Sequence, residues 1–383
     1  MISSLELEYF KCFKNVKVPF APLTLISGLN SSGKSSILQS LALLNQTFLD
    51  DRSNDRLLLE GRNVSLGTAG SIVNDIYGRN EIGIKIETKD DKFIHWKFDI
   101  PDEKNKPFFQ LKEAHSNNIQ YRYKSNDLLS YLLPIEKYKD DSNILEKLRN
   151  LFFLSAERIG PREVYSYPTT STKTIGSMGE YTPWYLHEFG NEKISTKIQK
   201  KEYDNKLIRQ VEGWMNDFFP GFEMQINVVN DANVVTMGIR TNRTSRFHRP
   251  QNVGFGITHL LPIITACIGQ KEKNVVLIQN PESHLHPEGQ SMVGYFLAII
   301  ASAGIQVIFE THSDHVLNGV RKALKQEKIK AQDVLFYFFQ TNEEGNAEIT
   351  NPSVDQKGNL DFWPEGFFDQ FDKDLEYFTD WGE

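Results

Sequence analysis

The stretch Gly28-Leu29-Asn30-Ser31-Ser32-Gly33-Lys34-Ser35 matches the phosphate-binding pattern G-x-x-x-x-G-K-[ST] at every fixed position. The apolar run Pro22 to Ile26 precedes it and has strand character, and residues 36–48 carry apolar side chains at helical spacing. A strand, a glycine-rich loop and a helix, in this order, are the setting that such a loop requires. The sequence therefore predicts a nucleotide-binding P-loop.

The residues of this loop have separate expected roles. Backbone N–H groups close around the phosphates, where the helix N-terminus adds partial positive charge. Lys34 is expected to reach the β- and γ-phosphates, and the Ser35 hydroxyl is expected to bind Mg²⁺. The predicted cofactors are therefore ATP and Mg²⁺. The predicted nucleotide contacts in the loop are Asn30, Ser31, Ser32, Gly33, Lys34, Ser35 and Ser36.

The overall composition is that of an ordinary soluble protein. The 383 residues are 24% charged and 39% hydrophobic. No apolar run approaches the ~20 residues of a membrane helix, and residues 1–6 lack the basic and apolar regions of a signal peptide. We expect a cytoplasmic protein without membrane contact. Cys12 and Cys267 are too few for a disulfide framework and are expected in the core.

The net charge of −7 limits the partners that the protein can attract. The whole molecule would repel a nucleic-acid backbone, so any such binding would have to be local or supplied by a partner. Two basic stretches are local candidates, and either could instead be a solvated face. They are residues 193–206 and the group Arg240, Arg243, Arg246, His248 and Arg249.

The second half of the chain holds three further elements of a nucleotide site. Residues 274–278 form a buried strand followed by Gln279-Asn280-Pro281-Glu282, where the acidic end of a Walker B strand is expected. Residues 306–309 form another strand that ends in Glu310-Thr311-His312, which places His312 to sense the γ-phosphate. Ahead of both strands, a glycine-rich turn opens a helix and suits anion binding by backbone N–H groups. Its predicted contacts are Gly254, Gly256 and Thr258.

These elements, in this order, resemble the ATP-binding-cassette (ABC) ATPases of the RecF, SMC and OLD type. The resemblance is closer to a bacterial group of AAA-family ATPases with a C-terminal domain of unassigned function. It is carried by residues 10–13, 28–35, 155–162, 280–287, 310–315 and 363–368. In the larger family, the P-loop of one head faces the glycine turn of another, which implies a nucleotide-dependent homodimer or higher oligomer. ATPases of this appearance often accompany a separate effector, such as a nuclease, in phage defence or genome maintenance.

The Walker B region departs from the family pattern. The wider family has Asp-Glu before the proline and the closer group has Glu-Asn, whereas this chain has Gln279 and Asn280. An amide resembles a carboxylate in shape, but it cannot take a proton from water or contribute charge near Mg²⁺. We therefore expect slow hydrolysis, with Glu282 as the only nearby carboxylate. Natural variation and a replacement of glutamate that traps bound ATP would both account for Gln279.

The resemblance assigns roles to these residues. The predicted catalytic set is Gln279, Asn280, Glu282 and His312, and the predicted metal ligands are Ser35 and Gln279. Two other patterns in the chain lack the setting that their chemistry needs, so we predict neither activity. His284 and His286 do not have the helical H-E-x-x-H arrangement of a zinc enzyme. Arg243 and His248 match an R-x-x-x-x-H ribonuclease pattern, but they lie in a predicted loop.

The predicted fold is α/β, an ABC-type P-loop ATPase head with a mixed sheet, an antiparallel flank and an inserted helical lobe. Residues 1–100 form the N-terminal ATPase part with the P-loop and the flank, and residues 101–220 form the partly helical lobe. Residues 221–340 carry the glycine turn, the Walker B strand and the switch histidine. Residues 341–383 form a C-terminal extension.

Two groups near the site each allow two interpretations. Phe10 and Phe13 could stack on adenine or belong to a buried hairpin. Arg158 or Arg162 could point at phosphate, or Arg158 could form a structural ion pair with Glu157.

The acidic, aromatic end of the chain could dock a partner or pack on its own core. The helical spacing of Phe371, Leu375 and Phe378 favours packing. Three functions follow from the sequence: an ATPase that dimerises around ATP and regulates an effector, a non-hydrolysing ATP-gated scaffold, and an ATP-dependent DNA-binding clamp.

Overall fold

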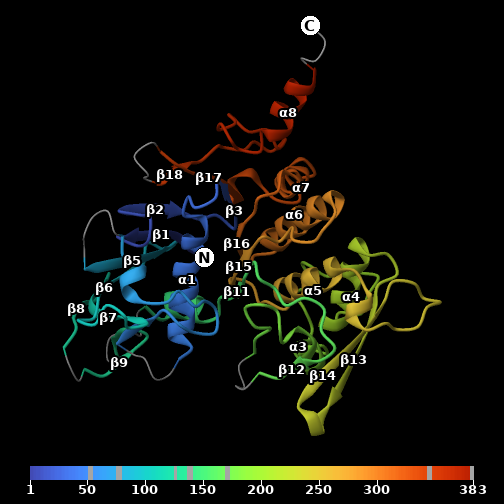
Figure 1. The fold of residues 1–383 in the computed structure, drawn as a ribbon, viewed down its shortest axis with the longest axis horizontal. Helices are drawn as coiled ribbons and strands as arrows, with labels where there is room; N and C mark the ends of the chain where they lie inside the picture. Colours follow the sequence, from blue (N-terminus) through green and yellow to red (C-terminus); the bar gives the residue numbers. More distant parts are fainter. Residues whose placement is uncertain are drawn as a thin grey trace.

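The computed structural model describes residues 1–50, 55–74, 80–124, 127–135, 141–168, 173–342 and 347–379. A mainly parallel sheet lies at the centre, an antiparallel sheet lies beside α1, and a smaller sheet belongs to a separate lobe (Figure 1). The mixed α/β fold with an antiparallel flank is therefore confirmed. No helix among the described residues is both long and apolar enough to span a bilayer.

The central sheet has the strand order β11-β15-β16-β3-β17-β18. All of its strand pairs are parallel except the edge pair of β17 and β18. The strands are β3 (Leu23–Gly28), β11 (Phe152–Leu154), β15 (Val275–Gln279), β16 (Gln306–Glu310), β17 (Val334–Thr341) and β18 (Ala347–Thr350). Parallel strands covered on both faces read as continuous apolar runs, and every residue of β15 and β16 is buried. The carboxyl ends of β3, β15 and β16 meet at one edge of this sheet.

Helices cover both faces of the central sheet. Val276 and Ile278 of β15 pack in a core with helices α5 (Phe255–Ile268), α6 (Pro287–Ser302) and α7 (Asp314–Lys325). Val275 and Leu277 pack on the opposite face, in a core shared with α1 (Lys34–Phe48). Successive side chains of a strand point to opposite faces, so Gln279 lies on the α1 side.

The antiparallel sheet packs against α1 in the same core. Its order is β2-β1-β5-β6-β7-β4, and β8 pairs with β7. The strands are β1 (Ile2–Glu8), β2 (Asn15–Pro19), β4 (Arg56–Leu58), β5 (Glu81–Thr88), β6 (Phe93–Asp99), β7 (Phe108–Ser116) and β8 (Gln120–Arg122). A short ribbon of β9 (Leu129–Ser130) and β10 (Leu133–Pro134) and helix α2 (Ser142–Arg149) follow along the chain.

The lobe is built around a three-stranded sheet of order β12-β14-β13. It comprises β12 (Tyr165–Ser166), α3 (Thr182–Phe189), α4 (Leu207–Phe218), β13 (Glu223–Val229) and β14 (Val234–Arg240). Short 3-10 turns occupy Ala69–Ser71, Asn230–Ala232, Pro250–Asn252 and Ala331–Asp333. Because β7 and β8 pair in the antiparallel sheet and β11 in the central one, sheet membership favours a lobe that begins near residue 155, later than the predicted residue 101.

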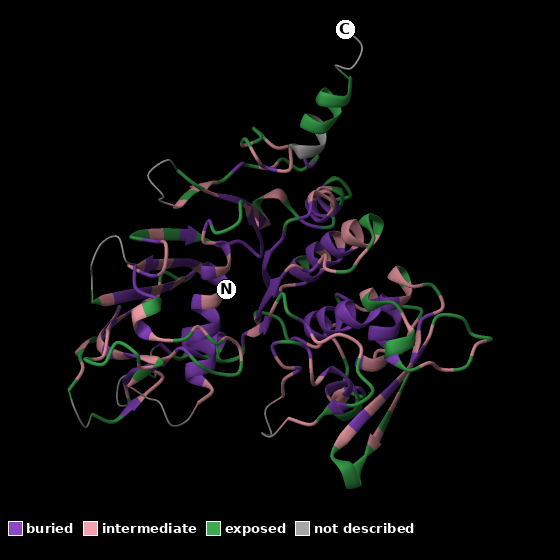
Figure 2. Ribbon diagram, in the orientation of Figure 1, coloured by how far each residue is buried: buried purple, intermediate pink, exposed green. Residues whose placement is uncertain are grey.

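The C-terminal helix α8 (Gln370–Thr379) projects from the body of the protein (Figures 1 and 2). Phe367 is fully buried, and its ring lies 5.4 Å from that of Phe338. Beyond this anchor, Leu375 is 51% and Phe378 67% exposed, so the expectation that they pack on the core is wrong. Their spacing is helical, but no core surface lies beneath them. The side chain of Phe371 and residues 380–383 lie outside the described residues.

Candidate nucleotide-binding site

The P-loop joins β3 to α1, as the sequence predicts. Gly28 has φ +144°, and a Cβ there would lie 2.0 Å from the carbonyl oxygen of Phe339 in β17. Gly33 has φ +97°, and a Cβ there would lie 2.5 Å from the Cys12 sulfur and 2.6 Å from the Phe13 ring. Only glycine fits both the backbone angles and the space at these two positions.

Lys34 and Ser32 are held inside the loop. Both side chains are buried, and the Lys34 ammonium donates to the carbonyl oxygens of Gly28 at 3.0 Å and Leu29 at 2.5 Å. The Ser32 hydroxyl donates to the same Leu29 oxygen at 2.7 Å. Burial lowers the pKa of Lys34, and the nearby Glu310 carboxylate partly opposes that shift. The charged side chain therefore lies within the loop, as a phosphate-binding lysine requires.

Phe10 and Phe13 belong to the core below this loop. Phe10 is fully buried, and Phe13 meets Phe339 edge to face at 6.4 Å. Phe13 lies against Gly33 of the P-loop and Phe10 is buried in the same core, so the structure favours the buried hairpin over stacking on adenine.

Three polar side chains meet where the carboxyl ends of β15 and β16 approach the start of α1. The Ser35 hydroxyl donates to Oε1 of Glu310 at 2.9 Å. The amide nitrogen of Gln279 donates to Oε2 of the same carboxylate at 3.2 Å. Glu310 and Gln279 are both buried. The structure thus brings the two predicted metal ligands, Ser35 and Gln279, to opposite oxygens of one glutamate.

Glu310 had no assigned role in the sequence analysis, and the statement that Glu282 is the only nearby carboxylate is wrong. The signal was present: an acidic residue ends a buried strand next to the P-loop strand. The Walker B pattern places the acidic residue on β15. The sequence does not show that β16 is the strand next to β3, because sheet topology decides that, so the role of Glu310 was missed.

Glu282 is engaged with the end of β16. Its Oε2 accepts from the Thr311 hydroxyl at 2.8 Å, and its Oε1 accepts from the backbone N–H of His312 at 2.9 Å. The backbone N–H of Asn280 donates to the carbonyl oxygen of Glu310 at 2.8 Å. The predicted residues Asn280, Glu282 and His312 therefore lie together at this edge, and the His312 side chain is exposed. Their catalytic roles stay predictions.

Arg158 supports the same edge from the other side. Its guanidinium donates to the carbonyl oxygens of Gln279 at 2.7 Å, Asn280 at 2.6 Å and Ser155 at 3.0 Å. It is 4% exposed, and burial lowers its pKa to about 10. For Arg158 both interpretations were wrong, since its guanidinium binds backbone carbonyl groups instead of Glu157 or a phosphate position. Arg162 is exposed, and a contact between it and phosphate stays a prediction.

The glycine turn lies at the N-terminus of α5. Gly254 and Phe255 are exposed, whereas Thr258 is buried and its hydroxyl donates to the Phe255 carbonyl oxygen at 3.0 Å. A Cβ on Gly256 would lie 2.8 Å from the backbone oxygen of His284, so the turn packs against the loop after β15. The ring of His259 lies 4.3 Å from that of His284, and its pKa falls to about 4, chiefly through burial and then through Arg158 and His284.

The arginines before this turn are largely paired with acids. Arg240 and Arg243 both form ion pairs with Glu223, and Arg249 pairs with Glu163. Such pairing reduces the positive charge that this stretch can offer to a phosphate backbone, so the solvated-face interpretation is favoured.

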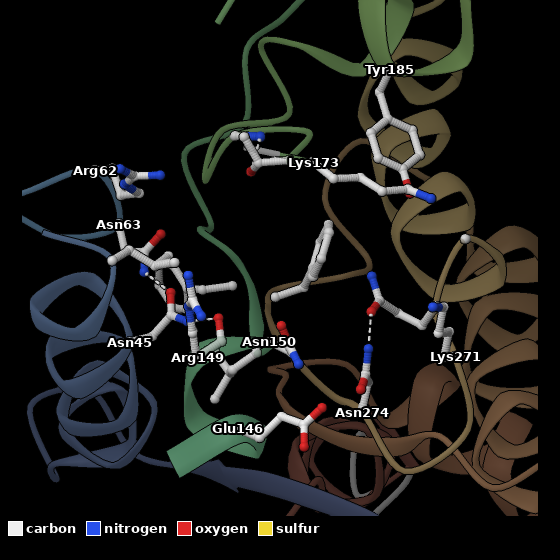
Figure 3. Close-up of a pocket in the computed structure, with 18 of the residues that line it drawn as sticks. Asn45, Arg62, Asn63, Glu146, Arg149, Asn150, Lys173, Tyr185, Lys271 and Asn274 are labelled. Carbon is white, nitrogen blue, oxygen red and sulfur yellow. Dashed lines mark hydrogen bonds between the residues drawn. The ribbon is translucent and has the colours of Figure 1, made fainter. Parts of the chain in front are cut away.

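A cavity of about 470 Å³ lies at the opposite edge of the central sheet (Figure 3). Phe152, at the start of β11, and Asn274, just before β15, line it, so it is remote from the P-loop edge. Two pairs of its polar side chains bond to each other: Asn63 to Asn45 at 2.7 Å and Asn274 to Gln270 at 2.9 Å.

The parallel sheet, the P-loop and the acidic strand end define a P-loop ATPase of the ABC type, a class that binds a nucleotide and typically Mg²⁺. The chain belongs to the family described as "AAA domain, putative AbiEii toxin, Type IV TA system", whose profile matches residues 23–318. Residues 329–377 match a second family, described as "Protein of unknown function (DUF3696)". No curated protein matches the sequence.

Solved structures share the fold at low sequence identity. An SMC head bound to the C-terminal winged-helix domain of ScpA is 16% identical, with a TM-score of 0.55 and coverage of 92% of this chain and 98% of that one. A Pyrococcus furiosus SMC head with an extended coiled coil, bound to the C-terminal domain of ScpA, is 13% identical, with a TM-score of 0.49 and coverage of 99% of each chain. The predicted likeness to SMC heads is therefore confirmed at the level of the fold.

Proposed function

We propose that this protein is an ATP-driven switch, in which bound ATP holds two copies together and loss of the γ-phosphate lets them separate. The observation that carries the proposal is the contrast between a buried Lys34 and an exposed glycine turn. Gly254 has open space on its side-chain face, with no atom within 4 Å of an added Cβ, and Phe255 is 55% exposed. A second P-loop with its ATP would cover this surface.

The switch would act on a separate effector protein, such as a nuclease, in the cytoplasm. The family description names a toxin of a toxin–antitoxin system, and the similar SMC head is bound to a domain of another protein. Both support an ATPase that works with a partner in phage defence or DNA maintenance. The paired arginines make a DNA-binding clamp the weaker alternative.

A non-hydrolysing ATP-gated scaffold is the second candidate. The two amides at Gln279 and Asn280 favour it, because neither can accept the proton of an attacking water. In this case ATP binding alone, without hydrolysis, would hold the two copies of the chain together.

The test is to measure steady-state ATP hydrolysis and ATP-dependent self-association of the wild-type protein and Gln279→Glu, with Lys34→Ala as the control that cannot hold phosphate. We expect ATP to dimerise the wild-type protein, and Gln279→Glu to raise turnover by at least about tenfold. Assembly with ATP but no turnover in either protein would establish the scaffold. Failure of both proteins to bind ATP would refute both functions.

A further inference from the structure

The position of Glu310 in the sheet places its carboxylate at the P-loop. It ends β16, the strand between β15 and the P-loop strand β3. In the parallel register, Glu310 pairs with Gln279 on one side and with Ile26 on the other. Ile308, two residues earlier, packs in the core with α1, so Glu310 points to the same side. The acidic group therefore comes from β16, one strand closer to the P-loop than Gln279.

The Glu310 carboxylate is buried and, among the described residues, is hydrogen-bonded to no cation, although Lys34 lies close enough to interact with it electrostatically. The residue is 4% exposed, and the Ser35 hydroxyl and the Gln279 amide, which donate hydrogen bonds to its carboxylate, are both neutral. Lys34 directs its ammonium to backbone carbonyl groups. Within the described ranges, Glu310 forms no ion pair. A buried carboxylate is costly unless a cation compensates it, so this position favours a bound cation.

We propose that Glu310, together with Ser35, holds the Mg²⁺ of bound ATP, and that Gln279 is the neutral side chain that orients the Glu310 carboxylate. This assignment rests on the proposed function, because it names the metal ligand of the same ATP site. Mg²⁺ prefers oxygen ligands and commonly takes one or two from the protein, with phosphate oxygens and water completing its shell. Accordingly, no group of three or more metal-binding side chains is needed, and none occurs among the described residues.

Gln279 suits this arrangement better than a glutamate would. Its amide nitrogen donates to Glu310, and its amide oxygen accepts from the backbone N–H of Ala156 at 3.4 Å. A glutamate at position 279 would place a second carboxylate beside Glu310, and two like charges at this distance do not both ionise without a proton or a metal between them. The Gln279 amide on β15 and the Glu310 carboxylate on β16 are therefore complementary as donor and acceptor. The acidic residue of the site lies on β16, the strand next to β15.

The test compares ATP affinity in Mg²⁺ and in EDTA, by calorimetry, for the wild-type protein, Glu310→Gln and Glu288→Gln. We expect Mg²⁺ to tighten ATP binding by the wild-type protein. Glu310→Gln should reduce that gain by at least about tenfold, while its affinity in EDTA stays within about twofold of wild type. Glu288→Gln, the matched control at an exposed glutamate outside the site, should keep the gain. An undiminished Mg²⁺ effect in Glu310→Gln overturns the assignment.

A second measurement does not depend on the folding of Glu310→Gln. Wild-type protein labelled with ¹³C at the glutamate carboxylates and loaded with Mn²⁺ and ATP should show a ¹³C coupling to Mn²⁺ by electron–nuclear double resonance. The coupling should persist in Glu282→Gln. Its absence from the wild-type protein, with ATP bound, overturns the role of Glu310 and leaves the proposed ATP switch intact. Absence of ATP binding by the wild-type protein in both Mg²⁺ and EDTA overturns the two together.

Discussion

The P-loop and the turn at Gly254 are both glycine-rich loops that open a helix, but their surroundings differ. The P-loop is enclosed by its own chain: Lys34 and Ser32 are buried, and Phe339 lies against Gly28. The turn at Gly254 is exposed. One loop is thus completed by the fold of a single chain, whereas the other lies exposed at the N-terminus of α5. The difference explains why two copies would be needed to enclose ATP.

The largest expected effect is at the enclosed loop. Lys34→Ala removes the ammonium from the phosphate site, so we expect ATP affinity to fall by at least about 100-fold. The loss should be the same in EDTA as in Mg²⁺, because the lysine contacts phosphate directly. Calorimetric titration of ATP measures it, and the thermal unfolding curve serves as the folding control. An ATP affinity of Lys34→Ala close to that of the wild-type protein would contradict the assignment of the P-loop as the enclosed phosphate site.

A substitution in the exposed turn at Gly254 should affect ATP-dependent self-association only. Gly254→Glu has room for its side chain, but it places a negative charge where a γ-phosphate would approach. We expect ATP-dependent self-association to weaken by at least about tenfold, with ATP affinity of the monomer within about twofold of wild type. Analytical ultracentrifugation with and without ATP measures it, and Gly254→Ala is the matched control. Unchanged assembly in Gly254→Glu would show that the turn does not face a second copy.

Arg158 should contribute to stability because it fixes the carboxyl end of β15. Arg158→Met keeps much of the side-chain volume but removes the guanidinium donor from three backbone carbonyl groups. We expect the free energy of unfolding to fall by about 2–4 kcal/mol. Chemical denaturation measures it. Arg162→Met, in the same loop but exposed, should change stability by less than about 0.5 kcal/mol. Equal effects of the two substitutions would contradict a specific role for Arg158.

The smallest expected effect is in α8, whose described side chains, residues 373–379, are all exposed. Leu375→Glu should change the free energy of unfolding by less than about 0.5 kcal/mol, because the side chain is already exposed. Phe367→Ala, at the buried anchor, should cost about 3–5 kcal/mol. Denaturation of the two variants side by side measures both. A large loss in Leu375→Glu would mean that α8 packs on the body or on another copy.

Much of the fold could be predicted from local patterns. The P-loop carries fixed residue types because phosphate binding needs glycines, a lysine and a hydroxyl in one short loop. The apolar runs before Gln279 and Glu310 predicted buried strands, and the alternation in the first hundred residues predicted the antiparallel flank. The extent of the lobe was harder. Within the predicted partly helical lobe, α4 begins only at Leu207. The preceding residues are held by contacts such as the Gln210 amide to the Lys200 carbonyl oxygen.

The sequence by itself determined that a phosphate-binding loop, two buried strand ends and a second glycine turn occur along one chain. Only the tertiary structure decided which of these groups touch. Strand order puts β16 between β15 and β3, so Glu310, not Gln279, meets Ser35. Burial turns Arg158 inward to backbone carbonyls, and the absence of a core surface beneath α8 leaves its apolar residues exposed. The physical reason is that residue spacing fixes the direction of a side chain within its own element, whereas its partners depend on which elements pack together.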